Sequence, residues 1–448
     1  MNTIIEALRS RESVSGWKLN IHKQESYELF FVKGKLETLR RTDTCDKQVT
    51  VYVQHGDDLG DSQFYVYPST TPQQLEQLID EAVAKALLIN NPSYTLPDAD
   101  TGDYQVESNF HDYDPAQLAS EICKTVFDAG HAENSALNSL EVFINRHEET
   151  VCNSRGLEKK QLRYSAMVEA IPTYNGAEQS VELYEQYNFG HLDTEALSRE
   201  IAGKMAEVKA RYEAVTPDFP LECKVILNPE ELSQLFMTIA SDANYASVYS
   251  NSNLFKKGDS IQSAPVGDKI GITMAGEVPG CIYSRKFDSD GMALNSIRLI
   301  DEGKVVNYYG SNRFGQYLGE EPTGALWCFC VDAGSADSAA FSTGPYLEVV
   351  SMSGLQVDSY SDYVGGEIRL AYYHDGEKMI PVTGISISGK LSEVLNDLHL
   401  SRDTTVFNSY CGPAKAMTGA LKIFSTAKIL RGNTRRSVFT FWVDSLLH

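Results

Sequence analysis

From Gly16 to Tyr67, hydrophobic and polar positions alternate in short runs such as WKLNIHK, YELFFVKG, KLETLRR and KQVTVYVQ. This period of two predicts antiparallel strands, separated by polar or glycine-containing turns. The period changes after Thr71, a predicted N-cap that is followed by Pro72 in the first turn of a helix. Apolar residues then recur every three or four positions, so we expect an amphipathic helix that ends before Pro92.

The same order of strands and then a helix recurs between residues 137 and 215. Three alternating runs, LNSLEVFINRHEETVCNS, KKQLRYSAMVEAIPT and SVELYEQYNFG, precede a predicted helix in DTEALSREIAGKMAEVKARYEAV. We therefore expect residues 1–215 to form an N-terminal domain of two similar β-rich units, each covered by a helix. The sequence identity between the two units does not by itself establish a duplication.

Two prolines in TPDFPLEC, Pro217 and Pro220, mark the predicted domain boundary. After a further helix that begins at Pro229, the chain becomes rich in glycine and β-branched residues. Asp375-Gly376 between two alternating runs is a strong β-hairpin signal. We expect residues 216–448 to form a C-terminal domain of mainly antiparallel sheet with few helices, and the chain to belong to the α+β class.

Composition and charge narrow the classes of function. Hydrophobic residues make up 42% of the chain and charged residues 22%, which is ordinary globular usage. The formal charge of -22 opposes a salt-dependent grip on phosphate backbones. The chain shows neither a signal-peptide pattern nor an apolar run of about 18 residues. We expect a cytoplasmic protein without nucleic-acid or membrane partners.

The segment HEETVC, which begins at His147, looks like an interrupted HExxH zinc motif. That motif requires a helix that places two histidines one turn apart on the same face. Here Val151 stands at the second histidine position, and VFINRHEETV alternates like a strand. We interpret His147 as an exposed strand residue and not as a zinc ligand.

Eight cysteines are scattered along the chain, which is long enough to need no disulfides to hold its core together. Only Cys328 and Cys330 are close in sequence, and a strand would turn both thiols to one side. That arrangement could bind a metal, but we favour the interpretation that both are small buried residues of a sheet. The chain has neither a GxSxG nucleophile motif nor a GxxxxGKS or GxxxxGKT phosphate loop.

Five segments occur in a fixed order: VCNSRGL at 151–157, FDSDGMALNSIRLIDEGKVVNYYGS at 287–311, PTG at 322–324, GLQVD at 354–358 and EIRLAYYHDGEKMIPVTGISISGKLSEVL at 367–395. The ordered set resembles the TldD/TldE (PmbA) family, whose members are known as candidate modulators of DNA gyrase and as zinc metallopeptidases. The resemblance implies a cytosolic assembly of two subunits. In that assembly only the TldD-type chain binds zinc, through an HExxxH motif on a helix and a cysteine near the C-terminus.

By position, the zinc helix of the family corresponds to the helix that follows the predicted boundary. Aligning its apolar Leu-Phe pair puts Met237 and Thr238 where the family has His and Glu, and Asp242 where it has the second His. A thioether and a hydroxyl cannot replace an imidazole ligand and a general base. The resemblance therefore implies a TldE-like chain without zinc or another cofactor, and a TldD-like partner that carries the zinc.

Cys411, in NSYCGPAKAMTG, matches the cysteine of the family, although Pro413 replaces the residue that usually follows Cys-Gly. It is either a relic of the metal site, a nucleophile, or a small buried residue beside a tight turn, and we favour the last interpretation. A nucleophilic cysteine needs a base, for which His374 and His399 are the candidates.

These residues support three hypotheses about function. In the first, the chain is the peptide-holding subunit of a cytoplasmic metallopeptidase for unfolded peptides, as a heterodimer with a TldD-like chain or as a homodimer when alone. The peptide would pair with a sheet edge at Gly365, Gly366 and Glu367, where glycine lets another backbone approach closely. In the second, the chain is a self-contained hydrolase that uses Cys411. In the third, it is a stand-alone peptide-binding scaffold.

Overall fold

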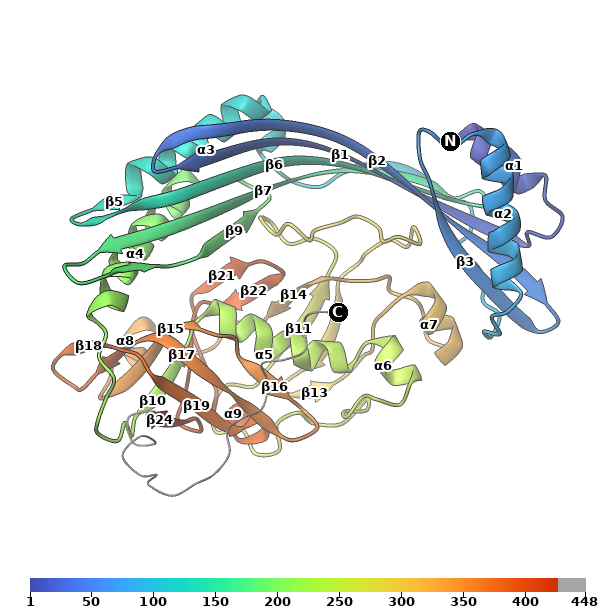
Figure 1. Ribbon diagram of the computed structural model, residues 1–448. Helices are drawn as coiled ribbons and strands as arrows, with labels where there is room; N and C mark the ends of the chain where they lie inside the picture. The colour runs from blue at the N-terminus through green and yellow to red at the C-terminus, as the bar shows by residue number, and fades with distance from the viewer. Residues whose placement is uncertain (426–448) are drawn as a thin grey trace, which may run out of the picture.

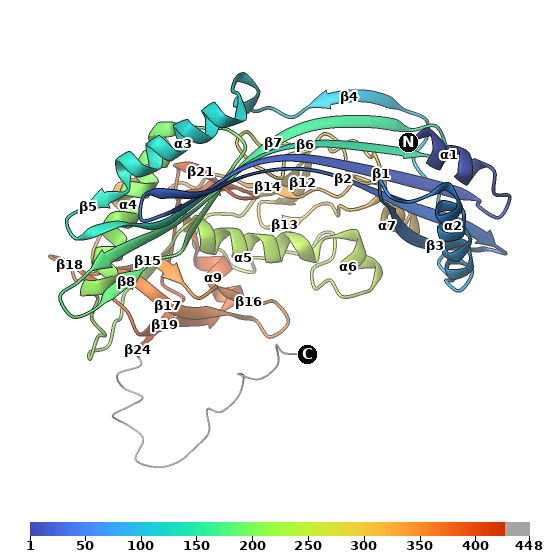
Figure 2. The same ribbon diagram turned by 45° about the horizontal axis from the view of Figure 1, so that its top comes forward.

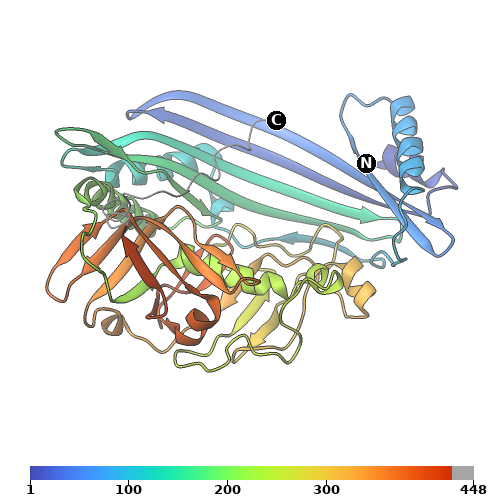
Figure 3. The ribbon, with the colours of Figure 1, turned by 60° about the horizontal axis from the view of Figure 1, so that its bottom comes forward.

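In the computed structural model, which describes residues 1–425, a long curved sheet from the first half of the chain arches over the second half (Figure 1). Figure 3 shows the same blue-to-green band of strands from another side, with the green-to-red second half along it. Strands dominate both halves and helices pack against them, which confirms the predicted α+β class. None of the described helices is long and apolar enough to cross a membrane.

The first half builds one sheet of nine strands in the order β3-β2-β1-β6-β7-β4, with β5 beside β6, and with β8 and β9 beside β7. Its elements are α1 (Asn2–Arg9), β1 (Gly16–Val32), β2 (Lys35–His55), β3 (Asp58–Val66), α2 (Pro72–Ala86), β4 (Thr101–Gln105), η1 (Phe110–Asp112), α3 (Pro115–Ala129), β5 (His131–Ala132), β6 (Ser135–Asn153), β7 (Glu158–Asn175), β8 (Ser180–Glu182), β9 (Glu185–Phe189) and α4 (Thr194–Glu213). The two predicted β-rich units are therefore halves of a single sheet, joined where β1 pairs antiparallel with β6.

Strands β1 and β2 are longer than the sequence pattern predicts. They run for 17 and 21 residues without the expected internal turns. The two-residue turn between them places Lys33 and Gly34 at positive φ, which is typical of a type I′ hairpin. Polar residues such as Gln24 and Glu25, which look like turn residues in the sequence, pair with both neighbouring strands, so they do not interrupt the strand.

The two faces of the first sheet differ in polarity because side chains alternate along each strand. On one face Leu19 packs with α1 and α2, and Val142 packs with α3 and α4. Figure 1 shows these two helix pairs at opposite ends of the sheet, and α2 and α4 are the covering helices that the sequence predicts. The other face carries polar side chains such as Lys18 and Glu149, which form ion pairs with residues of the second half.

The second half contains a sheet of nine strands, β20-β23-β10-β15-β17-β19-β24 with β16 and β18 beside β17, and a sheet of six, β13-β12-β11-β14-β22-β21. Its elements are β10 (Lys224–Leu227), α5 (Pro229–Asp242), α6 (Tyr245–Tyr249), β11 (Ile272–Ala275), β12 (Ile297–Asp301), β13 (Lys304–Val305), α7 (Asn312–Leu318), β14 (Cys328–Val331), α8 (Ser338–Phe341), β15 (Tyr346–Met352), β16 (Gln356–Asp358), β17 (Tyr363–His374), β18 (Met379–Val382), β19 (Ile385–Lys390), α9 (Leu391–Asp397), β20 (His399–Leu400), β21 (Thr404–Phe407), β22 (Tyr410–Pro413), β23 (Ala416–Thr418) and β24 (Lys422–Ser425). The predicted hairpin at Asp375-Gly376 is confirmed as the turn between β17 and β18.

Candidate functional site

Helix α5 crosses the middle of the second half (Figures 1 and 2) and begins at Pro229, as the sequence predicts. Its apolar face, with Leu232, Leu235 and Phe236 buried, packs into the core that the two sheets share. The helix also contacts β21 and β22, so the strand that carries Cys411 lies beside it. The structure therefore brings together the two segments that correspond to the zinc helix and the zinc cysteine of the resembled family.

The three positions on α5 that correspond to the zinc motif have roles within the chain itself. The Thr238 hydroxyl donates a hydrogen bond of 2.9 Å to a backbone carbonyl of the preceding turn. The Asp242 carboxylate accepts hydrogen bonds from the backbone N–H groups of Leu254 and Phe255, at 2.7 and 2.9 Å. Met237 is half-buried against the apolar core. These side chains do not fit a zinc site, which needs three or four nitrogen, sulfur or carboxylate ligands with free lone pairs.

The part of the chain that the structure describes offers no other metal site. Among residues 1–425, no three His, Cys, Asp or Glu side chains lie where they could together hold a metal ion. The donor set around α5 therefore offers no replacement for the zinc ligands that the resembled family uses.

The Cys411 thiol is half-buried on β22, directly opposite Cys330 of the parallel strand β14. A hydrogen bond from the Cys330 thiol lowers the pKa of Cys411 to about 7, although burial opposes the shift. The same hydrogen bond raises the pKa of Cys330, because that thiol keeps its proton. The Cys411 thiol is therefore more acidic than an ordinary cysteine, but its hydrogen-bond partner is a second thiol and not a base.

The two histidines predicted as bases for Cys411 lie in the other sheet. His374, on β17, stacks on Tyr346 with the ring centroids 5.0 Å apart, and its Nδ1 accepts a hydrogen bond from the backbone N–H of Gly376. His399 lies on β20, whereas Cys411 belongs to the six-stranded sheet. Within residues 1–425, no described contact joins either imidazole to the Cys411 thiol.

His147 lies on strand β6, as the sequence predicts, but the expectation that it is exposed is wrong, because only 7% of its surface is accessible. Its Nδ1 lies 3.1 Å from Nε2 of His22, and its Nε2 lies 3.1 Å from the Ser165 hydroxyl. Burial, assisted by the positive charge of Arg163, lowers the pKa of His147 to about 3. The imidazole is therefore neutral, and the polar face of the first sheet is covered at this point.

The cover over this face is the segment 285–291, which is held by charged side chains of β6 and β7. Arg163 lies 3.0 Å from the Glu149 carboxylate, and Arg285 approaches the same carboxylate to 3.6 Å. Burial opposes ionisation of Glu149, but the two guanidinium charges outweigh it and hold the pKa of Glu149 below its ordinary value. The amide of Gln161 also bonds to the backbone of this segment. The contacts between the first sheet and the segment 285–291 of the second half are therefore made by polar side chains of the sheet.

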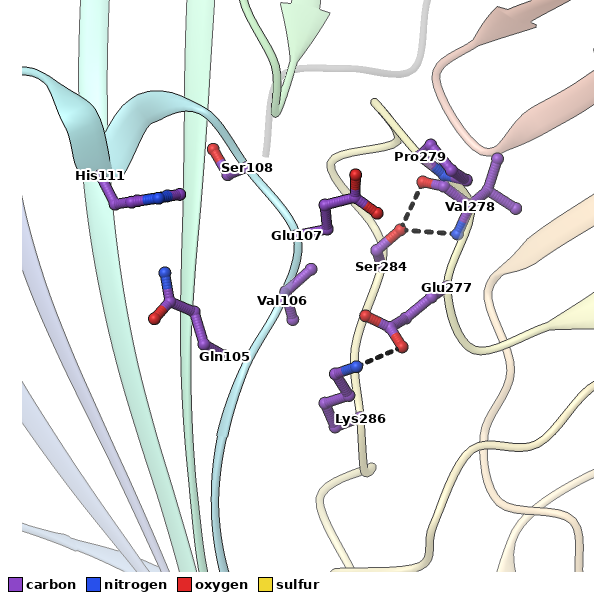
Figure 4. A pocket seen from close by; sticks show the side chains of 10 residues that line it. All are labelled: Gln105, Val106, Glu107, Ser108, His111, Glu277, Val278, Pro279, Ser284 and Lys286. Atoms are coloured by element: carbon purple, nitrogen blue, oxygen red, sulfur yellow. Dashed lines mark hydrogen bonds and ion pairs between the residues drawn. The ribbon is translucent and has the colours of Figure 1, made fainter.

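A cavity of about 410 Å³ opens next to this interface (Figure 4). Its lining residues come from both halves of the chain: Gln105, Val106, Glu107, Ser108, His111, Glu277, Val278, Pro279, Ser284 and Lys286. Glu277 and Lys286 form an ion pair of 2.6 Å, and the two serine hydroxyls donate to backbone carbonyls and not to a base. The cavity can hold a small polar group, but it presents no paired nucleophile and base. Sequence reasoning missed it because its walls are distant in the chain.

Gly365 and Gly366 lie on β17, where the predicted docking edge is occupied. Gly365 pairs with Gln356 of β16 on one side and with Ser388 of β19 on the other. A Cβ atom at Gly366 would lie 2.5 Å from the carbonyl oxygen of Gly354, so the close backbone approach takes place within the chain. A peptide could pair with β17 at this point only by displacing β16 or β19.

Comparisons with known proteins identify a family for the second half and a fold for the whole chain. A family model described as the PmbA/TldA metallopeptidase C-terminal domain matches residues 220–423. The structure is similar to TldE from Thermococcus kodakarensis, with a TM-score of 0.75 and 16% identity over 94% of this chain and 99% of that one.

Two further solved structures, each named as a candidate modulator of DNA gyrase, have the same fold. The protein from Thermotoga maritima has a TM-score of 0.72 and 14% identity, over 91% of this chain and 96% of that one. The protein from Bacteroides thetaiotaomicron has a TM-score of 0.74 and 14% identity, over 94% and 97%. A sequence search of curated proteins finds no match.

Proposed function

We propose that this chain, whose residues 220–423 match the model of the PmbA/TldA metallopeptidase C-terminal domain, is the zinc-free, TldE-like subunit of a cytoplasmic metallopeptidase for unfolded peptides. In this proposal a TldD-like partner chain supplies the zinc and the bond-breaking chemistry. The present chain completes the assembly and holds the extended substrate.

The observation that carries this proposal is the side-chain chemistry of α5. The resemblance matches this helix to the zinc helix of the family, yet Thr238 and Asp242 are hydrogen-bonded to backbone groups of their own chain, and Met237 packs against the core. A chain that keeps the fold of the family without ligands or a general base fits a binding subunit better than a catalytic one.

The substrate-holding role rests on strand addition, in which an unfolded peptide pairs with a free sheet edge through its main chain. The edge that supports this role is the outer side of β2 from Lys35 to Asp46, which no strand pairs within residues 1–425. Leu36 and Leu39 on this stretch are exposed and offer apolar contacts to alternate side chains of a peptide.

The proposal is tested by purifying the chain, measuring bound zinc, and assaying cleavage of an unfolded polypeptide with and without a TldD-like chain that has an intact HExxxH motif. We expect less than one zinc ion per ten chains, no cleavage by the chain alone, and cleavage by the mixture. Cys411→Ser should leave cleavage by the mixture unchanged.

Stoichiometric zinc in the isolated chain would overturn the proposal. Cleavage by the metal-free chain alone that disappears in Cys411→Ser would replace it with a thiol hydrolase. Failure to form a complex with any TldD-like chain would favour a stand-alone peptide-binding scaffold.

A further inference from the structure

Four of the eight cysteines come together beside the cavity, from three separate segments. Cys328 and Cys330 lie two residues apart on β14, so their side chains point to the same face of the six-stranded sheet. Cys411 on β22 lies opposite Cys330, and Cys281 reaches the cluster from the turn at residues 278–284. All eight cysteines are free thiols.

The shortest contact in this cluster joins Cys281 and Cys328, whose Sγ atoms lie 3.1 Å apart. The bond between the sulfur atoms of a disulfide is about 2.05 Å long, so closure requires a movement of roughly 1 Å. Both residues are buried, with 5% of the surface of Cys281 and none of the surface of Cys328 accessible. The two thiols are therefore held close together by the fold and not by chance contact of mobile side chains.

The turn that presents Cys281 is internally bonded. The backbone N–H of Cys281 donates to the carbonyl of Val278 at 3.0 Å, and the Ser284 hydroxyl donates to the same carbonyl at 2.9 Å. The Ser284 hydroxyl also lies 4.0 Å from the Cys328 thiol. These bonds fix the direction in which Cys281 points toward β14.

The cavity lies next to the pair, because Val278 and Ser284 belong to both the turn and the cavity lining (Figure 4). The two thiols are buried behind this lining, so we expect only an oxidant as small as hydrogen peroxide to reach them. The hydrogen bond from the Cys328 thiol also lowers the pKa of Cys281 below its ordinary value, against the effect of burial. Cys281 is therefore the more acidic thiol of the pair, and its thiolate is the nucleophile in the reaction below.

We propose that Cys281 and Cys328 form an oxidation-sensitive thiol pair, which hydrogen peroxide converts into a disulfide. The Cys281 thiolate attacks one oxygen of the peroxide, the O–O bond breaks, and a sulfenic acid and hydroxide form. The Cys328 sulfur then attacks the sulfenic sulfur, the S–O bond breaks, and the proton of Cys328 leaves with the hydroxyl group as water. Two thiols are oxidised and one peroxide is reduced to two water equivalents.

Oxidation would tie the cavity wall to the sheet beneath it. The carbonyl of Gly280, next to Cys281, accepts a hydrogen bond of 3.2 Å from the backbone N–H of Gly190, at the end of β9 in the first sheet. A disulfide to β14 would therefore fix the turn that links the two halves of the chain. This site is independent of zinc and of a partner chain.

The test is to treat the full-length reduced chain with hydrogen peroxide, block the remaining thiols, and map the digest without reduction. We expect the thiol count under denaturing conditions to fall from eight to six, one peptide pair that links Cys281 to Cys328, and return to eight thiols after dithiothreitol. The matched control is Cys123→Ala, which removes a buried thiol of α3 outside the cluster and should fall from seven to five.

Cys281→Ala should keep all seven thiols after the same treatment, whereas Cys328→Ala should give no linked peptide pair and stop at a sulfenic acid on Cys281. Circular dichroism checks that both variants are folded. The wild-type digest decides the question even if a variant does not fold. A count that stays at eight, a linked pair that joins Cys330 to Cys411 only, or conversion of Cys281 to sulfonic acid without a cross-link would overturn the proposal.

Discussion

The two outer edges of the first sheet differ, although β7 and β2, which carry them, are similar in length. The outer edge of β7 is paired in turn with β4, β9 and β8. The outer edge of β2 is paired with β3 only from Lys47 to His55, and no strand within residues 1–425 pairs with its remaining stretch, Lys35 to Asp46. One side of the sheet is closed and the other is open.

The two sides of the sheet therefore differ both in how deeply their strands are buried and in whether a further strand could pair with them. On the closed side, helices and the segment 285–291 bury the strands from both faces. On the open side, charged residues such as Arg40 and Arg41 occupy the strand, and charges on an edge oppose uncontrolled pairing between molecules. Arg40 is held by Glu28, and the Arg41 guanidinium lies 4.8 Å above the Tyr27 ring. The open edge is therefore charged and, within residues 1–425, not paired with a strand.

The largest difference between the two sides should appear in stability. Leu140 on β6 is fully buried and Leu39 on β2 is 49% exposed, so Leu140→Ala and Leu39→Ala delete the same atoms from the two environments. We expect Leu140→Ala to lower the free energy of unfolding by about 2–5 kcal/mol, because it leaves a cavity. Leu39→Ala should change it by less than about 0.5 kcal/mol. Urea denaturation measures both, and equal losses would show that the open side is buried in solution.

A smaller effect should appear in the pH dependence of the free energy of unfolding, through the buried His147. The pKa of His147 is lowered to about 3, whereas an unfolded histidine titrates near pH 6.5. As the pH falls from about 6.5 toward 3, the unfolded state binds a proton that the folded state does not bind, so stability falls. Between pH 6.5 and 5 this single site should cost about 1.5 kcal/mol.

His147→Gln keeps hydrogen-bonding capacity without a titrating group, so its stability should fall less steeply over this window. The charged and titratable groups that act on the ring are Glu149, Arg163, Arg285 and His22, and all are retained in the variant. His131→Gln, which replaces an exposed histidine, is the matched control and should follow the wild-type profile. Parallel profiles for all three proteins would mean that water reaches His147.

The spacing of hydrophobic residues and the local cap and turn residues predicted the elements that depend only on neighbouring residues. Helices α2, α4 and α5 and the hairpin after β17 were found in this way. Helix α3 was missed although its signal is present, since Asp114 caps it, Pro115 occupies its first turn, and apolar residues recur at helical spacing.

Long-range features could not be predicted from periodicity. The burial of His147 depends on the segment 285–291, which lies far away in the chain. Strands β1 and β2 are longer than predicted because polar residues inside them resemble turn residues in the sequence. The cavity and the thiol pair are formed by segments that meet only after folding. The resemblance to the family matched α5 and Cys411 to parts of one metal site, and the structure places the strand that carries Cys411 beside α5.

The smallest expected effect is a change in amide hydrogen exchange, which tests whether the open edge of β2 binds a peptide. Amide hydrogen exchange of residues 35–46 should slow by roughly two- to tenfold when an unfolded carboxymethylated polypeptide is added, because its main chain would bond to the free N–H groups of β2. The matched stretch of β7, residues 158–175, is already paired and should not change. Mass spectrometry of the exchanged peptides compares the two edges in one experiment.

The double variant Leu36→Lys and Leu39→Lys should weaken this protection without changing the free energy of unfolding by more than about 0.5 kcal/mol, because both side chains are exposed. Main-chain pairing is independent of the side chains, so the loss should be partial and not complete. Protection of residues 35–46 by a TldD-like chain but not by the polypeptide would make this edge a subunit interface. The substrate would then have to reach the assembly elsewhere, and the contrast between the two edges would concern assembly instead of peptide capture.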